Sequence, residues 1–212
     1  MTHKKNIIFD FDGTLADTIP VMYTITQEIA KEAGYERTIT PEDWEWVREH
    51  ELKDIPGKFR IPLIKIPFLL LEGSKKMKKQ MFSVPPCRGI VSVLKELKNT
   101  GYSLAILSSH RRDSIQEFIL KNNLVQLFDF VHSELNIFGK DKALISLLKH
   151  NNMSLEESIY VGDEIRDIQA CKKIKLDCIS VEWGLNSASA FKKYGAKWIV
   201  SKPSEIVELL EK

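Results

Sequence analysis

Asp10 and Asp12 are separated by one residue and stand at the end of the first aliphatic run of the chain. Side chains alternate along an extended chain, so we expect the two carboxylates to point to one side and Phe11 to the other. Carboxylates this close repel each other unless a cation or a proton-transfer role compensates the charge. An isolated pair of this kind is more often a solvated strand end or a helix cap. Here the preceding strand and the following Gly13 and Thr14 make the motif far more specific.

Two serines and a lysine stand where later apolar runs stop. Ser108 and Ser109 follow the second run, and Lys140 follows Gly139 at the expected start of a helix. A serine at a strand end commonly caps the next helix, but its hydroxyl can equally hold a phosphoryl oxygen there. Most lysines are solvated, yet the charge of Lys140 opposes the helix dipole, which is easier to explain if its ammonium points at an anion.

A second pair of carboxylates, Asp163 and Asp167, follows a glycine at the end of another aliphatic run. The two residues are one helical turn apart and share a face. Taken alone, Asp163 could cap this helix, and Asp167 could pair with Arg166 or with solvent. Two carboxylate pairs, a hydroxyl and a lysine at four strand ends together indicate a site for a hard cation and a phosphate group.

The elements that must position these residues are short aliphatic strands, each followed by an amphipathic helix. Nearly continuous aliphatic strands indicate a sheet that is covered on both faces, and strand–helix alternation indicates a parallel sheet. Ligands bind such a sheet at the carboxyl ends of its strands. The sequence thus predicts an α/β fold with a doubly wound parallel sheet. The expected strands cover residues 6–11, 102–107, 130–132, 158–161, 177–181 and 197–200, and the expected helices cover 89–99, 114–121, 142–150 and 203–210.

One long segment departs from this alternation. Residues 18–84 show helical periodicity and no strand pattern, so we expect them to form a mostly helical insertion. The core then consists of residues 1–17 and 85–212. Seven prolines punctuate the segment and its end, and we therefore expect short helices in it.

The bulk composition is that of an ordinary globular protein. The 212 residues include 31 basic and 29 acidic side chains, a net charge of +2 that gives no reason to expect nucleic acid or a membrane as partner. Three scattered cysteines without metal-ligand spacing fit a reducing compartment. The absence of a secretory or membrane-spanning pattern leads us to expect a cytoplasmic protein, and a monomer and a homodimer remain equally open.

These motifs, in this order and spacing, resemble the haloacid dehalogenase superfamily. DFDGTLADT is similar to its first motif, Ser108 to the second, Lys140 to the third and GDEIRD to the fourth. The helical insertion directly after the first motif resembles the small cap of the phosphoglycolate-phosphatase-like branch. The resemblance implies a Rossmann-like core with a cap that closes over the site.

The resemblance also implies a mechanism. Asp10 would attack phosphorus and form an aspartyl phosphate, while Asp12 would protonate the leaving alcohol and then activate water. Ser108, with Ser109 beside it, and Lys140 would bind the phosphoryl oxygens. The dehalogenases that name the superfamily do not carry the second aspartate, so Asp12 argues against carbon–halogen cleavage.

The cofactor that the resemblance implies is Mg²⁺. The Asp10 carboxylate, the Asp12 backbone carbonyl and Asp163 would hold the ion. Asp167 would orient Lys140 or the metal shell.

Substrate choice should depend on the insertion, because the core contacts only phosphate. Lys58 and Arg60 alternate with aliphatic residues there, and one hypothesis is that they bind an acidic group of the substrate. A solvated helix face is the more ordinary explanation of such charges. A basic, apolar surface for an acidic partner or a membrane is a third.

Three functions therefore remain open. The first is a magnesium-dependent phosphatase for a small phosphate monoester such as phosphoglycolate. The second is a phosphosugar mutase of the β-phosphoglucomutase type, which shares every core motif with the first. The third is a non-catalytic binding protein, which the presence of Asp12 beside Asp10 disfavours.

Overall fold

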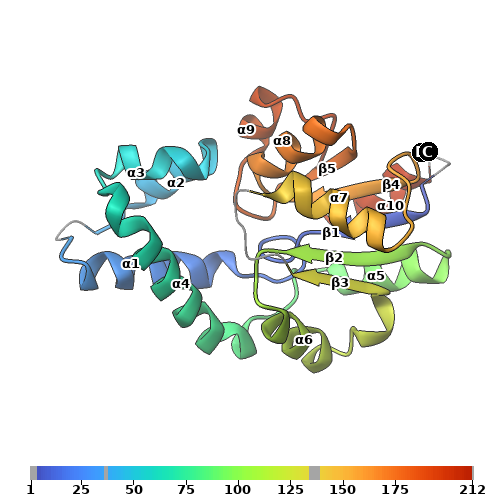
Figure 1. Cartoon of the computed structure of the whole chain (residues 1–212), viewed down its shortest axis with the longest axis horizontal. Helices are drawn as coiled ribbons and strands as arrows, with labels where there is room; N and C mark the ends of the chain where they lie inside the picture. Colours follow the sequence, from blue (N-terminus) through green and yellow to red (C-terminus); the bar gives the residue numbers. More distant parts are fainter. Residues whose placement is uncertain (1–3, 36–37, 134–138, 212) are drawn as a thin grey trace.

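The computed structural model describes residues 4–35, 38–133 and 139–211, so the outermost residues of the predicted core, 1–3 and 212, lie outside it. Six parallel strands form one sheet in the order β3-β2-β1-β4-β5-β6 (Figure 1). This arrangement confirms the predicted doubly wound α/β fold. The strands are β1 Asn6–Phe9, β2 Ser103–Ser108, β3 Phe130–Ser133, β4 Ser158–Gly162, β5 Asp177–Val181 and β6 Trp198–Val200.

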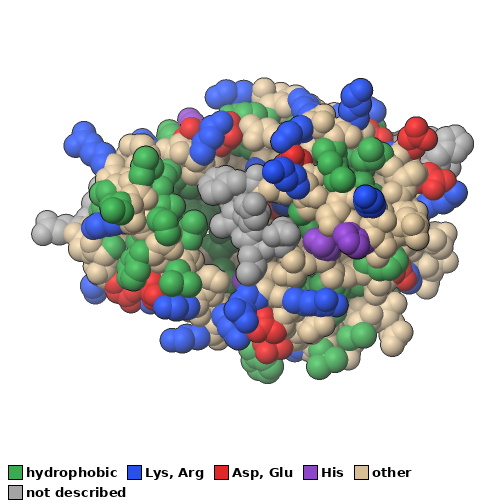
Figure 2. All heavy atoms as spheres, viewed as in Figure 1, with side chains coloured by type: hydrophobic (Ala, Val, Ile, Leu, Met, Phe, Trp, Pro, Cys, Tyr) green, Lys and Arg blue, Asp and Glu red, His purple; other side chains and the backbone are tan. Residues whose placement is uncertain are grey.

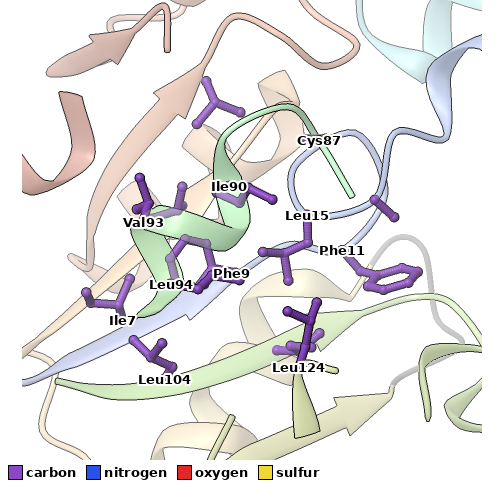
Figure 3. Packing of buried hydrophobic residues seen from close by; sticks show 14 of the residues in the cluster. Ile7, Phe9, Phe11, Leu15, Cys87, Ile90, Val93, Leu94, Leu104 and Leu124 are labelled. Carbon is purple, nitrogen blue, oxygen red and sulfur yellow. The ribbon is translucent and has the colours of Figure 1, made fainter. Parts of the chain in front are cut away.

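The alternation of side chains in β1 explains why its sequence is aliphatic throughout. Ile7 and Phe9 point into a core shared with α5 (Ile90–Asn99), α6 (Arg112–Lys121) and α10 (Ser204–Leu210), part of which Figure 3 shows. Ile8 points to the opposite face, where α7 (Lys140–His150) and α8 (Ile165–Ile174) pack. All three side chains are completely buried, so a strand covered on both faces leaves no position for a polar residue.

The first strand is shorter than predicted. It ends at Phe9, the chain bends at Phe11, and residues 13–15 form a turn. The Asp10 carboxylate accepts a hydrogen bond from the Phe11 N–H at 2.8 Å, and the Phe11 carbonyl accepts the N–H groups of Leu15 and Ala16. Gly13 adopts a φ of 68°, which glycine tolerates without strain. This turn places Asp10 at the very edge of the sheet.

The described part of residues 18–84, the predicted helical insertion, contains four α-helices: α1 Ile19–Glu32, α2 Pro41–Glu49, α3 Ile55–Lys58 and α4 Ile66–Gln80. Residues 36–37 lie outside the described part of the chain. Each helix has a proline in its first two positions, where the missing N–H costs nothing. The prolines therefore begin helices rather than interrupt them. The expectation of short helices is wrong for α1 and α4, which run for 14 and 15 residues.

The insertion lies beyond the end of the sheet at which the strands finish (Figure 1). Within it α1 packs against α4, and α2 reaches back to α9 (Ala188–Lys193) of the core. Across the described residues, no helix combines the length and the apolar character needed to cross a membrane.

Candidate active site

The order of the strands reverses between β1 and β4, and the candidate site lies at this point. β1 and β4 are neighbours, with β2 and β3 on one side and β5 and β6 on the other. Asp10 directly follows β1, and Asp163 directly follows β4. In open parallel sheets, ligands bind in the crevice that such a reversal opens beyond the carboxyl ends of the strands.

Three aspartates and one lysine meet there, and all four are buried. The Lys140 ammonium, in the first turn of α7, lies 2.5 Å from Asp10 Oδ2 and also pairs with Asp167 Oδ1. Asp10, Asp163 and Asp167 each place a carboxylate oxygen within 4.8 Å of the others. The structure thus brings together four residues that the sequence places at three different strand ends.

The negative charges of this cluster favour the binding of a cation. When all four groups are ionised, three carboxylates face one ammonium, and the adjacent Glu164–Arg166 ion pair cancels its own charge. This leaves an excess of two negative charges in a desolvated site. Burial raises the pKa of Asp10 to about 7, against the lowering effect of Lys140. Burial also raises the pKa of Asp163 well above its usual range, and the nearby Glu164 and Asp10 carboxylates add to this shift. A divalent ion bound by these carboxylates would compensate both charges.

The donors present fit Mg²⁺. They are all carboxylate oxygens, which hard divalent cations prefer, and they are held in fixed orientations. Thr14 Oγ1 donates to Asp163 Oδ1 at 2.9 Å, and the Leu185 N–H donates to Asp163 Oδ2 at 2.8 Å. The Glu164 N–H donates to Asp167 Oδ2 at 2.9 Å.

Two glycines make room for Asp163. A Cβ atom at Gly13 would lie 2.1 Å from Asp163 Oδ2, and one at Gly184 would lie 2.2 Å from Asp163 Cβ. Both distances are far below a van der Waals contact, so only glycine allows the chain to close around this carboxylate at either position.

Asp12 lies beside this cluster without joining it. Its carboxylate is not part of the group formed by Asp10, Asp163 and Asp167, and its side chain is partly exposed. Within the described part of the chain, Asp12 Oδ1 is buried and accepts no hydrogen bond, while Oδ2 lies 3.5 Å from His110 Nδ1. Asp12 therefore has one carboxylate oxygen whose hydrogen-bonding capacity is unused among the described residues.

Ser108 and Ser109 lie on the strand next to β1 and at its end. Phe9 pairs with Ile106, so Ser108 lies two residues further along, at the same edge of the sheet as Asp10. Ser108 is buried, and its Oγ accepts the His110 N–H at 2.9 Å. The following helix begins after Arg111, so Ser108 is not the residue that caps it.

The structure does not bring Lys58 and Arg60 into contact with the cluster. Both side chains are exposed, and the Lys58 ammonium lies 5.2 Å from the centre of the Trp46 ring, within the insertion. Two other basic residues in the described part of the insertion contact the core. Arg48 does so next to Asp163, where its Nη1 donates to the Gly184 carbonyl at 3.0 Å, and Lys78 does so at Asp113. Sequence reasoning missed Arg48, because it stands in a charged helix with nothing local to distinguish it.

The comparisons with known proteins agree with this geometry. Residues 7–181 match the family model described as haloacid dehalogenase-like hydrolase, which is most of the chain. The chain belongs to this family. The predicted resemblance and the predicted hydrolase class are thereby confirmed.

Relatives of this haloacid dehalogenase-like hydrolase are named as phosphatases. A phosphoglycolate phosphatase of Synechococcus elongatus is 28% identical over 202 residues, which cover 95% of both chains. A phosphoserine phosphatase of Methanocaldococcus jannaschii is 30% identical over 190 residues, which cover 82% of this chain and 83% of the relative. A solved haloacid dehalogenase-like hydrolase of Streptococcus pneumoniae shares the fold at a TM-score of 0.83 and 18% identity, with 99% of each chain covered.

Proposed function

We propose that this hydrolase is a magnesium-dependent phosphatase that cleaves a small phosphate monoester through an aspartyl phosphate on Asp10. The observation that carries the proposal is the buried cluster of Asp10, Lys140, Asp163 and Asp167, with the unbonded Asp12 oxygen beside it. Burying charges of one sign costs free energy, and such arrangements are found mainly at functional sites. A non-catalytic binding protein would have no use for this arrangement.

The residues divide the chemistry between them. Mg²⁺ held by Asp10 and Asp163, with the Asp12 carbonyl as a further ligand, would supply charge neutralisation where two anions meet. A carboxylate oxygen of Asp10 attacks phosphorus, and the bond from phosphorus to the ester oxygen breaks. Asp12 gives its proton to the departing alkoxide, which leaves as the alcohol.

The second half of the reaction reverses the role of Asp12. Its carboxylate takes a proton from water, and the resulting hydroxide oxygen bonds to the phosphorus of the aspartyl phosphate. The bond between phosphorus and Asp10 breaks, so inorganic phosphate forms and the Asp10 carboxylate is regenerated. Asp12 is again protonated for the next turnover.

Lys140 and Ser108 would stabilise the charge on the transferring phosphoryl group. Burial lowers the pKa of Lys140, but Asp10 and Asp167 more than offset this effect, so the pKa lies above its ordinary value and the side chain stays a cation. Its pairing with Asp167 fixes the ammonium beside Asp10, where a phosphoryl oxygen would arrive. We assign Asp167 this orienting role.

We further propose that the helical insertion acts as a cap that selects a substrate with a second acidic group. Phosphoglycolate and phosphoserine, the substrates in the names of two relatives, both carry a carboxylate. Arg48 is better placed to bind such a group than Lys58 or Arg60, because it lies at the contact between insertion and core. We also propose a cytoplasmic location, which the free cysteines Cys87, Cys171 and Cys178 support.

A panel of phosphorylated metabolites tests this function. Purified protein with Mg²⁺ should release phosphate from phosphoglycolate and phosphoserine faster than from neutral sugar phosphates. Arg48→Ala should raise KM for the acidic substrates by about tenfold or more, as expected for the loss of a charge-assisted pair. Lys58→Ala and Arg60→Ala serve as matched controls. Isomerisation of a sugar 1-phosphate without phosphate release would instead identify a mutase.

A further inference from the structure

The helical insertion and the core meet at a polar contact on one side of the candidate site. Residues 48–51, at the end of α2, face the loop 184–187 that follows β5. The Ser187 N–H donates to the Arg48 carbonyl at 3.0 Å, and the Tyr194 hydroxyl donates to Glu51 at 2.9 Å. Polar contacts of this kind join parts of a chain that can move relative to each other.

Asn186 occupies the centre of this contact. It is 2% exposed, and its amide Nδ2 donates to the carbonyls of Arg48 at 3.0 Å and His50 at 3.2 Å. Its Oδ1 accepts the N–H of Ile165, the first residue of α8, at 2.9 Å. The two carbonyl acceptors lie near Nδ2 and the N–H donor lies near Oδ1, so only one of the two flipped orientations of the amide satisfies all three hydrogen bonds. One side chain therefore joins the insertion to the helix that carries Asp167.

The backbone around Asn186 holds Asp163. The Asn186 N–H donates to the Asp163 carbonyl at 3.0 Å, and the N–H of Leu185 donates to the Asp163 carboxylate at 2.8 Å. Gly184 packs directly against Asp163, with no space for a side chain. A movement of this loop would therefore change the position of the Asp163 carboxylate.

We propose that Asn186 is a positioning residue that couples the docking of the helical insertion to the geometry of the cation site at Asp163. The proposal rests on the proposed function in one respect, that Asp163 binds Mg²⁺. Coupling between two sites is reciprocal. If docking of residues 48–51 favours the Asp163 geometry that binds the cation, then Mg²⁺ must favour docking of residues 48–51.

Two measurements on the full chain test the coupling: amide hydrogen exchange with and without saturating Mg²⁺, and Mg²⁺ binding by calorimetry. In the wild-type protein, Mg²⁺ should slow exchange several-fold in peptides that cover residues 48–54. Asn186→Ala should abolish this slowing and weaken Mg²⁺ binding about tenfold, the usual effect of removing a group that supports a metal ligand. A purely structural role for Asn186 would lower the melting temperature but leave the Mg²⁺-induced slowing unchanged.

Asn186→Asp separates the two halves of the contact. A carboxylate still accepts the Ile165 N–H but cannot donate to the Arg48 and His50 carbonyls. Mg²⁺ binding should therefore weaken, but by less than in Asn186→Ala because the contact to Ile165 is kept, while the slowing over residues 48–54 is lost. Tyr194→Phe is the matched control, because it removes a hydrogen bond at the same contact without touching the loop that holds Asp163. This variant should keep the slowing.

Several results would overturn the coupling. One is equal slowing by Mg²⁺ in the wild type and in Asn186→Ala, and another is no slowing in a wild type that calorimetry shows to bind Mg²⁺. Both leave the proposed phosphatase function intact. A wild-type protein that binds no Mg²⁺ would overturn the coupling and the cation site together. If Asn186→Ala does not fold, the wild type and Asn186→Asp still decide the question.

Discussion

The candidate active site and the outer surface of the helical insertion each place side chains against their ordinary preference, but in opposite ways. At the site, three carboxylates and an ammonium are buried. On the insertion, apolar side chains lie at the surface (Figure 2). Leu63 is 75% exposed and Ile64 is 89% exposed. Burying like charges costs much free energy, whereas exposing an apolar side chain costs little. The first arrangement is therefore much stronger evidence of function than the second.

The largest expected effect is the loss of activity when the nucleophile is removed. Asp10→Asn should lower kcat by roughly 10⁴-fold or more, because an amide cannot form the aspartyl phosphate. The fold should persist, since the change removes one of the excess negative charges in the cluster. Phosphate release from p-nitrophenyl phosphate and thermal unfolding measure the two effects. Turnover close to that of the wild type would rule out Asp10 as the nucleophile.

The second test concerns Asp12, which lies outside the buried carboxylate group. Asp12→Asn should reduce steady-state turnover by about 10²–10⁴-fold, because the general acid and base is lost. p-Nitrophenolate is a good leaving group and needs little protonation, so its release should show a burst of about one equivalent before the slow phase. Mg²⁺ affinity, measured by calorimetry, should stay within a few-fold of the wild type. A variant with neither a burst nor reduced turnover would remove Asp12 from the mechanism.

A third test uses pH and metal together. Burial raises the pKa of Asp10 to about 7 in the folded protein, above its ordinary value of 3.8. Without a metal, the folded state then binds more protons than the unfolded state between these values, so its stability falls as pH rises through that window. Mg²⁺ should remove this penalty by binding the charged form.

The expected result is a melting temperature that Mg²⁺ raises more at pH 8 than at pH 5. Thermal scans with Mg²⁺ and with chelator at both values measure the difference, and Asp10→Asn provides the control in which it shrinks. A Mg²⁺ effect of equal size at the two pH values would contradict a cation bound at Asp10.

Some residues of the site could be predicted from the sequence and others could not. Asp10 and Asp163 are signalled locally because each follows an aliphatic strand, and Lys140 because it follows a glycine at the start of a helix. Asn186 has no such signal, since the carbonyls that its side chain contacts lie more than 130 residues away in the sequence. Arg48 is hidden for the same reason.

Local rules also failed where two of them compete. Proline usually interrupts a helix, and this rule predicted short helices in the insertion. Proline in the first turn instead favours helix formation, and Pro20 and Pro67 hold this position in α1 and α4. Which rule applies depends on where the helix begins.

The smallest expected effect is on the insertion surface. Ile64→Ala should change the free energy of unfolding by less than about 0.5 kcal/mol, because the side chain has almost no contact to lose. Met77→Ala is the matched control, a truncation of similar size at a buried position of the same insertion, and should cost about 2–5 kcal/mol. Urea unfolding of both variants measures the difference. A loss of more than about 2 kcal/mol in Ile64→Ala would show that this exposed side chain is covered in solution, which would make the insertion surface an interface.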